Sequence, residues 1–225
     1  MTVYAMLSKT QLQTMFQLQA AMNFRVDPNW TSARYPYLRA VVVEAAEAIE
    51  HHGWKWWKQQ TRDLDQLQME LVDIWHFLLS EILLRNGADE DKARLYLEAT
   101  FGRQSATRSL QFDGQEYSLG DLELLDLLQA LIGTAAAGRI ELNLFAEIMS
   151  GCELGWQELY RQYVSKNVLN FFRQDHGYQE GTYRKIWGGR EDNEVLVEVM
   201  ATLDAEDPSF KDSLYTLLEA AYLKI

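Results

Sequence analysis

Cysteine and proline are both scarce in this chain. Its 225 residues include one cysteine, Cys152, so no disulfide can form within the chain, and this is typical of proteins from a reducing compartment. Only three prolines occur, and no run rich in Ser, Pro or Gly divides the chain. Together with 48% hydrophobic residues, this favours a folded chain over a disordered one. We expect a single domain over residues 1–225.

Long apolar runs are also missing. No run approaches the roughly 20 apolar residues that a helix needs to span a bilayer. The N-terminal stretch MTVYAMLSKTQLQ has neither the basic region nor the apolar region of a signal peptide. We therefore expect a soluble, cytoplasmic protein that has no membrane partner.

Basic residues are outnumbered by acidic ones. The 21 Lys and Arg residues stand against 33 Asp and Glu residues, which gives a net charge of −12. This excludes nucleic acid as an expected partner, because binding to a polyphosphate backbone requires a basic surface. A small anionic ligand is still compatible, since clustered carboxylates can bind divalent cations that in turn hold phosphates. The charge alone leaves two explanations open, an acidic surface or a metal-assisted phosphate site.

Helical periodicity runs through nearly the whole chain. Apolar residues recur at helical spacing after the capping-box start at Ser8, from Tyr37 to a stop at Gly53, and over residues 63–85 and 156–172. We find no internal repeat and no convincing strand pair. The pattern predicts an all-α fold, a helical bundle with its chemistry on facing helices. Residues 100–155 are expected to form a helical insertion, with residues 102–155 as a smaller, mobile subdomain.

Two pairs of carboxylates with a spacing of three residues stand out. Glu44 and Glu47 lie in EAAEAIE, and Glu70 and Asp73 lie in QMELVDIWHF. Because residues three apart share one face of a helix, two such pairs on separate helices can converge on one point. Ligation by oxygen alone suits Mg²⁺ or Mn²⁺.

The neighbours of Glu70 and Asp73 favour a metal site over a solvated face. The two carboxylates are embedded among the apolar residues Leu67, Leu71 and Ile74, where unpaired charge is costly. A solvated face stays open as the alternative for each pair alone. A di-iron site is disfavoured, since it needs Glu-x-x-His on two helices, and the chain offers only Asp73-x-x-His76. Glu50 is expected to face solvent or to lie behind the metal ligands.

A segment near the C-terminus concentrates the basic residues. In the stretch YVSKNVLNFFRQDHGYQEGTYRKIWGGREDN, five of them surround several glycines: Lys166, Arg173, Arg184, Lys185 and Arg190. Lys166, Asn170 and Arg173 fall on one face of a helix. A basic stripe followed by flexible backbone suits a triphosphate, because it supplies charge-assisted hydrogen bonds and a segment that can close over the ligand.

These motifs together resemble one family. EAAEAIEHHGWKWWK, ELVDIWHF, KNVLNFFRQDHGY, GTYRKIW, EDN and the early LQAAMN are similar to motifs of the dimeric, all-α dUTPases, which are relatives of the MazG-type nucleoside triphosphate pyrophosphatases. The resemblance spans about residues 17–193, with a less familiar portion at about 86–155. The carboxylate motifs alone would indicate only the wider superfamily, whereas the C-terminal motif points to the dUTPases.

The resemblance implies the helical bundle of the all-α NTP pyrophosphatases and an activity. It implies a homodimer that hydrolyses dUTP to dUMP and pyrophosphate with Mg²⁺, or Mn²⁺ as a substitute, which limits uracil in DNA and supplies dUMP. The implied metal ligands are Glu44, Glu47, Glu70 and Asp73. Glu47 is also the residue expected to orient or deprotonate the attacking water, and so the expected catalytic residue.

The resemblance also implies a substrate site. The residues expected to hold the phosphates are Lys166, Arg173, Tyr178, Lys185 and Asn193. Those expected near uracil are Gln19, Asn23 and Trp57, and those near the deoxyribose are His76 and Asn170. Amide groups suit uracil because they both donate and accept hydrogen bonds. At least one of Trp54, Trp56 and Trp57 is expected to serve only core packing.

Two alternatives stay open at this point. The first is a pyrophosphatase of broader specificity, such as one that accepts both dCTP and dUTP, or a MazG-like house-cleaning enzyme. The second is a non-enzymatic helical protein that binds partners through exposed aromatic and acidic faces. It would leave the basic residues of the C-terminal segment unexplained.

Overall fold

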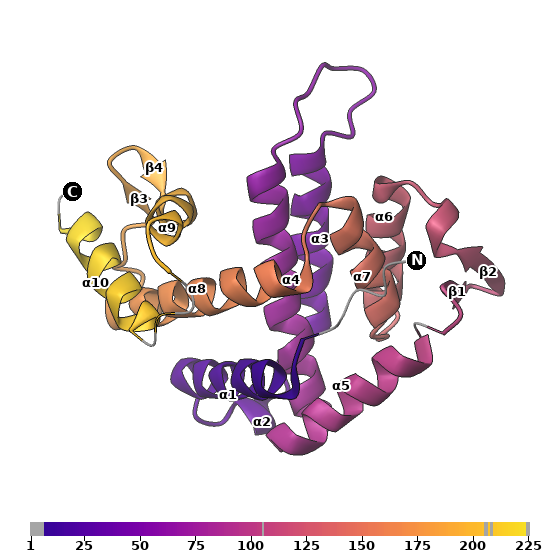
Figure 1. The fold of residues 1–225 in the computed structure, drawn as a ribbon, viewed down its shortest axis with the longest axis horizontal. Helices are drawn as coiled ribbons and strands as arrows, with labels where there is room; N and C mark the ends of the chain where they lie inside the picture. The colour runs from indigo at the N-terminus through magenta and orange to yellow at the C-terminus, as the bar shows by residue number, and fades with distance from the viewer. Residues whose placement is uncertain (1–6, 105, 205–206, 208, 224–225) are drawn as a thin grey trace.

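The computed structural model describes residues 7–104, 106–204, 207 and 209–223. The described residues form ten α-helices and two short two-stranded sheets (Figure 1), so the predicted all-α fold is confirmed. The helices are α1 (Lys9–Val26), α2 (Trp30–Ala33), α3 (Tyr37–His52), α4 (Leu64–Arg85), α5 (Glu90–Gln104), α6 (Leu124–Ala136), α7 (Leu142–Gly151), α8 (Trp156–Asp175), α9 (Asp192–Ala201) and α10 (Phe210–Tyr222).

Helices α3 and α4 form the central pair of the fold. Figure 1 shows them side by side, joined by a loop of residues 53–63 that protrudes from the rest of the molecule. The loop begins at Gly53, which adopts a φ of 84°. Glycine has no Cβ, so it adopts a positive φ without steric strain. It ends at Asp63, whose side chain accepts a hydrogen bond from the backbone N–H of Gln66 and so caps α4.

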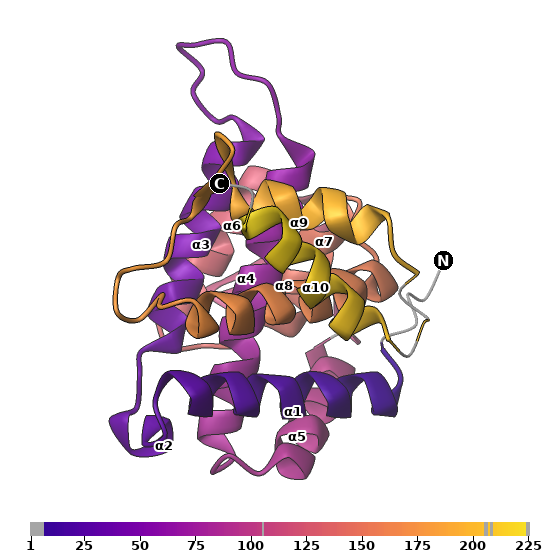
Figure 2. The same ribbon diagram turned by 90° about the vertical axis from the view of Figure 1, so that its left-hand side faces the viewer.

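Helices α1 and α8 complete the surroundings of the central pair. The predicted capping box of α1 is present, since Ser8 and Gln11 exchange hydrogen bonds between side chain and backbone. Helix α1 packs against α4, α5 and α8, and α8 also packs against α4. Figure 2 shows α8 crossing the molecule above α1, with α10 lying over α8. Four helices, α1, α3, α4 and α8, therefore meet around one region.

Trp75 of α4 connects several of these helices in the core. Its side chain is fully buried, and its Nε1–H donates to the sulfur of Met15 on α1 at 3.4 Å. Its ring stacks on Phe145 of α7 with centroids 5.2 Å apart and meets Trp156 of α8 edge to face at 5.7 Å. Such aromatic contacts stabilise the folded protein beyond the free energy gained by burying apolar surface.

The expectation of no strand pair is wrong. Strands β1 (Ser109–Phe112) and β2 (Gln115–Ser118) form one antiparallel hairpin, and β3 (Ile186–Trp187) and β4 (Arg190–Glu191) form another. The two-residue turns are Asp113-Gly114 and Gly188-Gly189, and all four residues have positive φ. Asp-Gly and Gly-Gly are favoured in such tight hairpins because both turn positions require positive φ. Helical periodicity could not reveal these strands, but the dipeptides could have.

The region expected to be a helical insertion contains α6 and α7 together with the β1–β2 hairpin and a short 3₁₀ helix, Leu119–Asp121. Helix α6 packs against α3. The mobility of residues 102–155 stays a prediction. Among the helices of the described residues, none combines the length and the apolar character needed to cross a membrane.

Replacing Trp75 with Ala should destabilise the protein by about 3–5 kcal/mol, because the change leaves a large cavity among α1, α4, α7 and α8. The midpoint and slope of urea unfolding, followed by circular dichroism, measure this loss. Trp56→Ala is the matched control, since Trp56 is 85% exposed and its loss should cost under about 0.5 kcal/mol. Equal losses in the two variants would contradict this role for Trp75.

Candidate functional site

The two carboxylate pairs come together where α3 packs against α4. Glu44, Glu47 and Glu70 each place an oxygen within 4.8 Å of the others. Asp73 lies one turn along α4 from Glu70, and its charge acts on both Glu70 and Glu44. Glu70 is only 7% exposed, whereas Glu47 lies at the exposed side of the cluster. The helix–helix interface therefore contains four carboxyl groups, which we call the carboxylate cluster.

Burial and mutual repulsion change the protonation of this cluster. Burial, together with the charges of Asp73 and Glu44, raises the pKa of Glu70 to about 9. Burial and the charge of Asp73 also raise the pKa of Glu44 to about 7. At neutral pH and without a cation, Glu70 therefore keeps a proton, which it shares in a hydrogen bond with Glu44. A cation bound at this point would allow Glu44 and Glu70 to ionise.

Lys166 of α8 supplies a positive charge to the cluster. Its side chain is almost fully buried, and its Nζ donates to Oδ2 of Asp73 and to Oδ1 of Asn193, both at 2.8 Å. A buried ammonium group needs such partners, because it has lost its hydration. One lysine does not balance four carboxylates, so the cluster keeps an excess of negative charge.

Arg173 lies two turns further along α8 and is held by a second acidic residue. Its Nε and Nη2 each donate to Asp192 at 2.8 Å, and Nη2 also donates to Asn193 at 3.2 Å. Nη1 donates to Asn170 at 3.2 Å, and the guanidinium lies 5.8 Å from the ring centre of Tyr178. Burial disfavours the charged guanidinium and so lowers its pKa. The hydrogen bonds to Asp192 and its negative charge outweigh this effect and hold the pKa of Arg173 above its ordinary value. The planar head group is therefore fixed in one orientation.

A cavity of about 580 Å³ opens between α1, α3, α4 and α8. Its size lies in the range of small-molecule sites. Many of the predicted site residues line it: Gln19, Asn23, Glu44, Asp73, His76, Asn170, Arg173 and Tyr178. Two members of the carboxylate cluster and Arg173 of α8 thus border the same space as the amides of α1.

His76 lies in the wall of this cavity in its neutral form. Burial lowers the pKa of its ring to about 4. Its Nδ1 lies 2.9 Å from the carbonyl oxygen of Val72, which can only accept, so Nδ1 carries the proton. Its Nε2 is buried and has no partner within the described part of the chain. The cavity wall therefore offers a free acceptor at His76.

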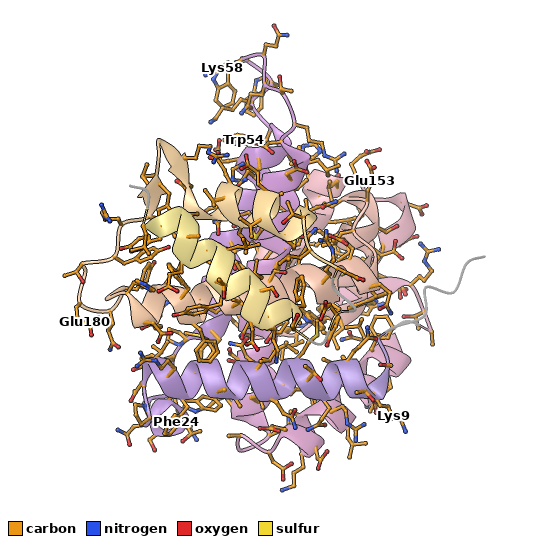
Figure 3. All side chains as sticks on the ribbon, turned by 60° about the vertical axis from the view of Figure 1, so that its left-hand side comes forward. Lys9, Phe24, Trp54, Lys58, Glu153 and Glu180 are labelled. Carbon is orange, nitrogen blue, oxygen red and sulfur yellow. The ribbon has the colours of Figure 1, made fainter. Side chains whose placement is uncertain are left out.

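Six of the predicted residues do not line the cavity: Glu47, Trp57, Glu70, Lys166, Lys185 and Asn193. Trp57 is 59% exposed in the loop of residues 53–63, and Figure 3 shows the neighbouring Trp54 and Lys58 at the opposite end of the molecule from Phe24 of α1. Lys185 pairs with Glu191 at 3.1 Å on the surface. The carboxylate cluster meets the cavity through Glu44 and Asp73, while Asn193 reaches the site through Lys166 and Arg173.

The structure contradicts the prediction for the three tryptophans and agrees with the prediction for Glu50. None of Trp54, Trp56 and Trp57 is buried, so the expectation that one of them serves core packing is wrong; they pack edge to face against one another instead. Glu50 lies on the exposed side and binds Lys55 and Trp54, as expected for a residue outside the cluster.

Three residues that shape the site were not predicted from the sequence. Asp192 orients Arg173 and also accepts a hydrogen bond from the hydroxyl of Tyr183 at 2.8 Å. Ser80 and Tyr163 bind the amide of Gln19 from behind the cavity wall. Asp192 gave a weak signal as an acidic residue beside a basic segment, but Ser80 and Tyr163 gave none, because their roles depend on contacts between helices.

Comparison with known protein families identifies the family of this chain. A family model described as dUTPase matches residues 11–178, which are 168 of the 225 residues. The matched range includes both carboxylate pairs and the basic stripe of α8, and it ends before Lys185, Asp192 and Asn193. No curated protein matches the chain.

Without divalent cations, the stability of the protein should depend on pH through Glu70. The pKa of Glu70 is about 9 in the folded protein against an ordinary value of 4.5. Its contribution to stability is therefore fully present below pH 4.5 and is lost as the pH rises toward 9. Glu70→Gln, which resembles the protonated form, should remove this loss. In EDTA, the Tm of the variant minus that of the wild type should increase from pH 5 to pH 9. Each kcal/mol by which the free energy of unfolding of the wild type falls relative to the variant corresponds to roughly 2–4 °C in this Tm difference.

Differential scanning calorimetry at several pH values measures this difference. Glu116→Gln is the matched control, since Glu116 is exposed on β2 and its replacement should give a difference that hardly changes with pH. A Glu70→Gln difference that stays constant over this range would contradict the perturbed state of Glu70.

Proposed function

The chain belongs to the all-α dUTPase family and hydrolyses dUTP, and from this premise we propose that the reaction takes place in the cavity between α1, α3, α4 and α8. The proposed products are dUMP and pyrophosphate. The observation that carries the proposal is that Glu44 and Asp73 of the carboxylate cluster, Arg173 of α8 and the amides of α1 border one cavity. Each is suited to a different part of a deoxynucleoside triphosphate.

The cluster fits a hard divalent cation. Its donors are carboxylate oxygens, which Mg²⁺ and Mn²⁺ prefer, and members of this family are generally metal-dependent. The raised pKa values of Glu44 and Glu70 are a sign of uncompensated negative charge. Glu44, Glu47, Glu70 and Asp73 would hold Mg²⁺, or Mn²⁺ in its place. When bound, the ion would neutralise phosphate charge and increase the acidity of a nearby water molecule.

Glu47 is the residue of the cluster best placed to act on water. It is the exposed member of the three clustered glutamates, so solvent can reach its carboxylate, whereas Glu70 is enclosed. A carboxylate within hydrogen-bond reach of a water molecule can orient it and accept its proton. Glu47 is therefore the proposed catalytic residue.

The basic residues of α8 are suited to the phosphates. Lys166 and Arg173 place two positive charges next to the cluster, and Asn193 links them through its side-chain oxygen. Fixed charges of this kind stabilise the negative charge that develops on departing pyrophosphate. Tyr178 lies at the mouth beside Arg173. The side chain of Lys185 pairs with the half-exposed Glu191, so this flexible side chain can exchange that partner for a phosphate.

The amide-lined part of the cavity is suited to the nucleoside. Gln19, Asn23, His76 and Asn170 all border it, and the proposed arrangement places uracil near the first two and the deoxyribose near the others. A role for Trp57 stays a prediction. Homodimerisation and a cytoplasmic location are proposed from the resemblance and the composition alone.

Family membership decides against a non-enzymatic interaction protein. Measuring the turnover of dUTP, dCTP, dTTP and UTP with Mg²⁺ distinguishes a strict dUTPase from a pyrophosphatase of broader specificity. We expect turnover of dUTP alone, with dUMP and pyrophosphate identified by chromatography. Comparable turnover of dCTP or of all four nucleotides would assign the site to a pyrophosphatase of broader specificity.

Glu47→Gln should lower kcat for dUTP by about 10²–10⁴, because the amide keeps the size of the side chain but cannot accept a proton from water. Pyrophosphate release measures the rate, and circular dichroism checks that the fold is unchanged. Glu50→Gln is the matched control on the same helix, since the exposed carboxylate of Glu50 binds Lys55 and Trp54. Full activity in Glu47→Gln, or an equal loss in the control, would exclude the proposed role of Glu47.

A further inference from the structure

Four side chains form a hydrogen-bonded chain behind the wall of the cavity. Tyr163 on α8 binds Gln19 on α1, Gln19 binds both Ser80 on α4 and Asn23 on α1, and Ser80 approaches Asn23. All four residues are buried. Gln19 and Asn23 line the cavity, whereas Ser80 and Tyr163 do not. An amide group can be turned over without changing its shape, so the direction of these bonds determines what the cavity presents.

Ser80 sets the direction of the chain. Its Oγ lies 3.0 Å from the carbonyl oxygen of His76, one turn earlier in α4. It also lies 3.2 Å from Oδ1 of Asn23. A hydroxyl has one proton and both of these oxygens can only accept, so the proton of Ser80 is donated to one of them. The oxygen of Ser80 is then left as an acceptor. The atom of Gln19 at 2.9 Å from it must be the donor, Nε2.

The remaining bonds follow from this orientation of Gln19. Its Oε1 turns toward Tyr163, whose hydroxyl donates to it at 2.9 Å. Its Nε2 also donates to Asn23 at 3.1 Å, so the atom of Asn23 facing inward is the acceptor, Oδ1. The Nδ2 of Asn23 is thereby turned away from the chain. It is buried and has no hydrogen-bond partner within the described residues.

Because Asn23 borders the cavity, its enclosed Nδ2 is an unpaired N–H donor within the cavity wall. A buried donor without a partner is costly, and a ligand that supplies an acceptor removes this cost. Uracil carries a carbonyl oxygen at C4, which accepts a hydrogen bond. Cytosine carries an amino group there, which would place a second donor against the first. The two bases thus differ at the atom for which the direction of the amide matters most.

We propose that Ser80 and Tyr163 are positioning residues for base specificity, because they hold the amides of Gln19 and Asn23 in the direction that accepts uracil and rejects cytosine. This inference rests on the proposed function, in which the base enters the amide-lined part of the cavity. Neither hydroxyl needs to touch the substrate.

The test compares kcat/KM for dUTP with kcat/KM for dCTP. In Ser80→Ala, Gln19 Nε2 loses its acceptor and the amides can turn over, so the ratio should fall by about tenfold or more. Ser165→Ala is the matched control. Ser165 is a buried serine of α8 whose hydroxyl donates to the carbonyl one turn earlier, that of Arg161 at 2.9 Å, and its variant should keep the wild-type ratio. General destabilisation would lower both rates and leave the ratio unchanged.

Two further variants keep the test independent of the folding of Ser80→Ala. Tyr163→Phe keeps the ring that stacks on His76 at 4.2 Å but removes the donor to Gln19, so the ratio should fall in the same direction. Asn23→Asp replaces the unpaired N–H donor in the cavity wall with an oxygen, which should invert the preference toward dCTP.

The outcomes separate this inference from the proposed function. A wild-type enzyme that strongly prefers dUTP, with an unchanged ratio in folded Ser80→Ala and Tyr163→Phe, would overturn the positioning role and leave the proposed function intact. A wild-type enzyme that hydrolyses dCTP as fast as dUTP would overturn the positioning role and would assign the site to a pyrophosphatase of broader specificity. A reduced ratio in the hydroxyl variants together with inversion in Asn23→Asp would establish the inference.

Discussion

The fold is organised around a costly arrangement, four carboxyl groups in the interface between two packed helices. Glu44 and Glu47 on α3 face Glu70 and Asp73 on α4, and burial together with the neighbouring negative charges raises the pKa of Glu44 and of Glu70. Such a cluster is stable only if it keeps protons, gains positive partners or binds a cation. Lys166 supplies one positive partner, and the excess charge explains why a divalent cation fits the site.

Helix α8 links this cluster to the rest of the site. Along one face it carries Lys166, Asn170 and Arg173, and its C-terminal end is tied to α9 through the pair of Arg173 and Asp192. The same helix carries Tyr163, which binds the amide of Gln19. One helix thus positions the phosphate-binding charges and also the groups that orient the base-binding amides. A shift of α8 would therefore affect both ends of the substrate.

Much of this arrangement could be predicted from the sequence, because it depends on local patterns. Helical spacing paired Glu44 with Glu47 and Glu70 with Asp73, while Gly53 and Asp63 marked the ends of their helices. The two hairpins were missed, although Asp113-Gly114 and Gly188-Gly189 were visible as turn signals. Contacts between distant segments left no local pattern: nothing in the sequence showed that Ser80 and Tyr163 would meet Gln19, or that the loop with Trp57 would protrude away from α1.

Whether the carboxylates of α3 and α4 form a cation site is decided most directly by proton release on metal binding. Mg²⁺ is added to the metal-free protein in weakly buffered solution at pH 7, and the liberated protons are recorded with a pH electrode. Because Glu70 is protonated at this pH and Glu44 titrates near it, binding at the cluster should release roughly one proton or more per chain, with saturation. Binding without proton release, or no saturable response, would show that the cluster does not hold the ion.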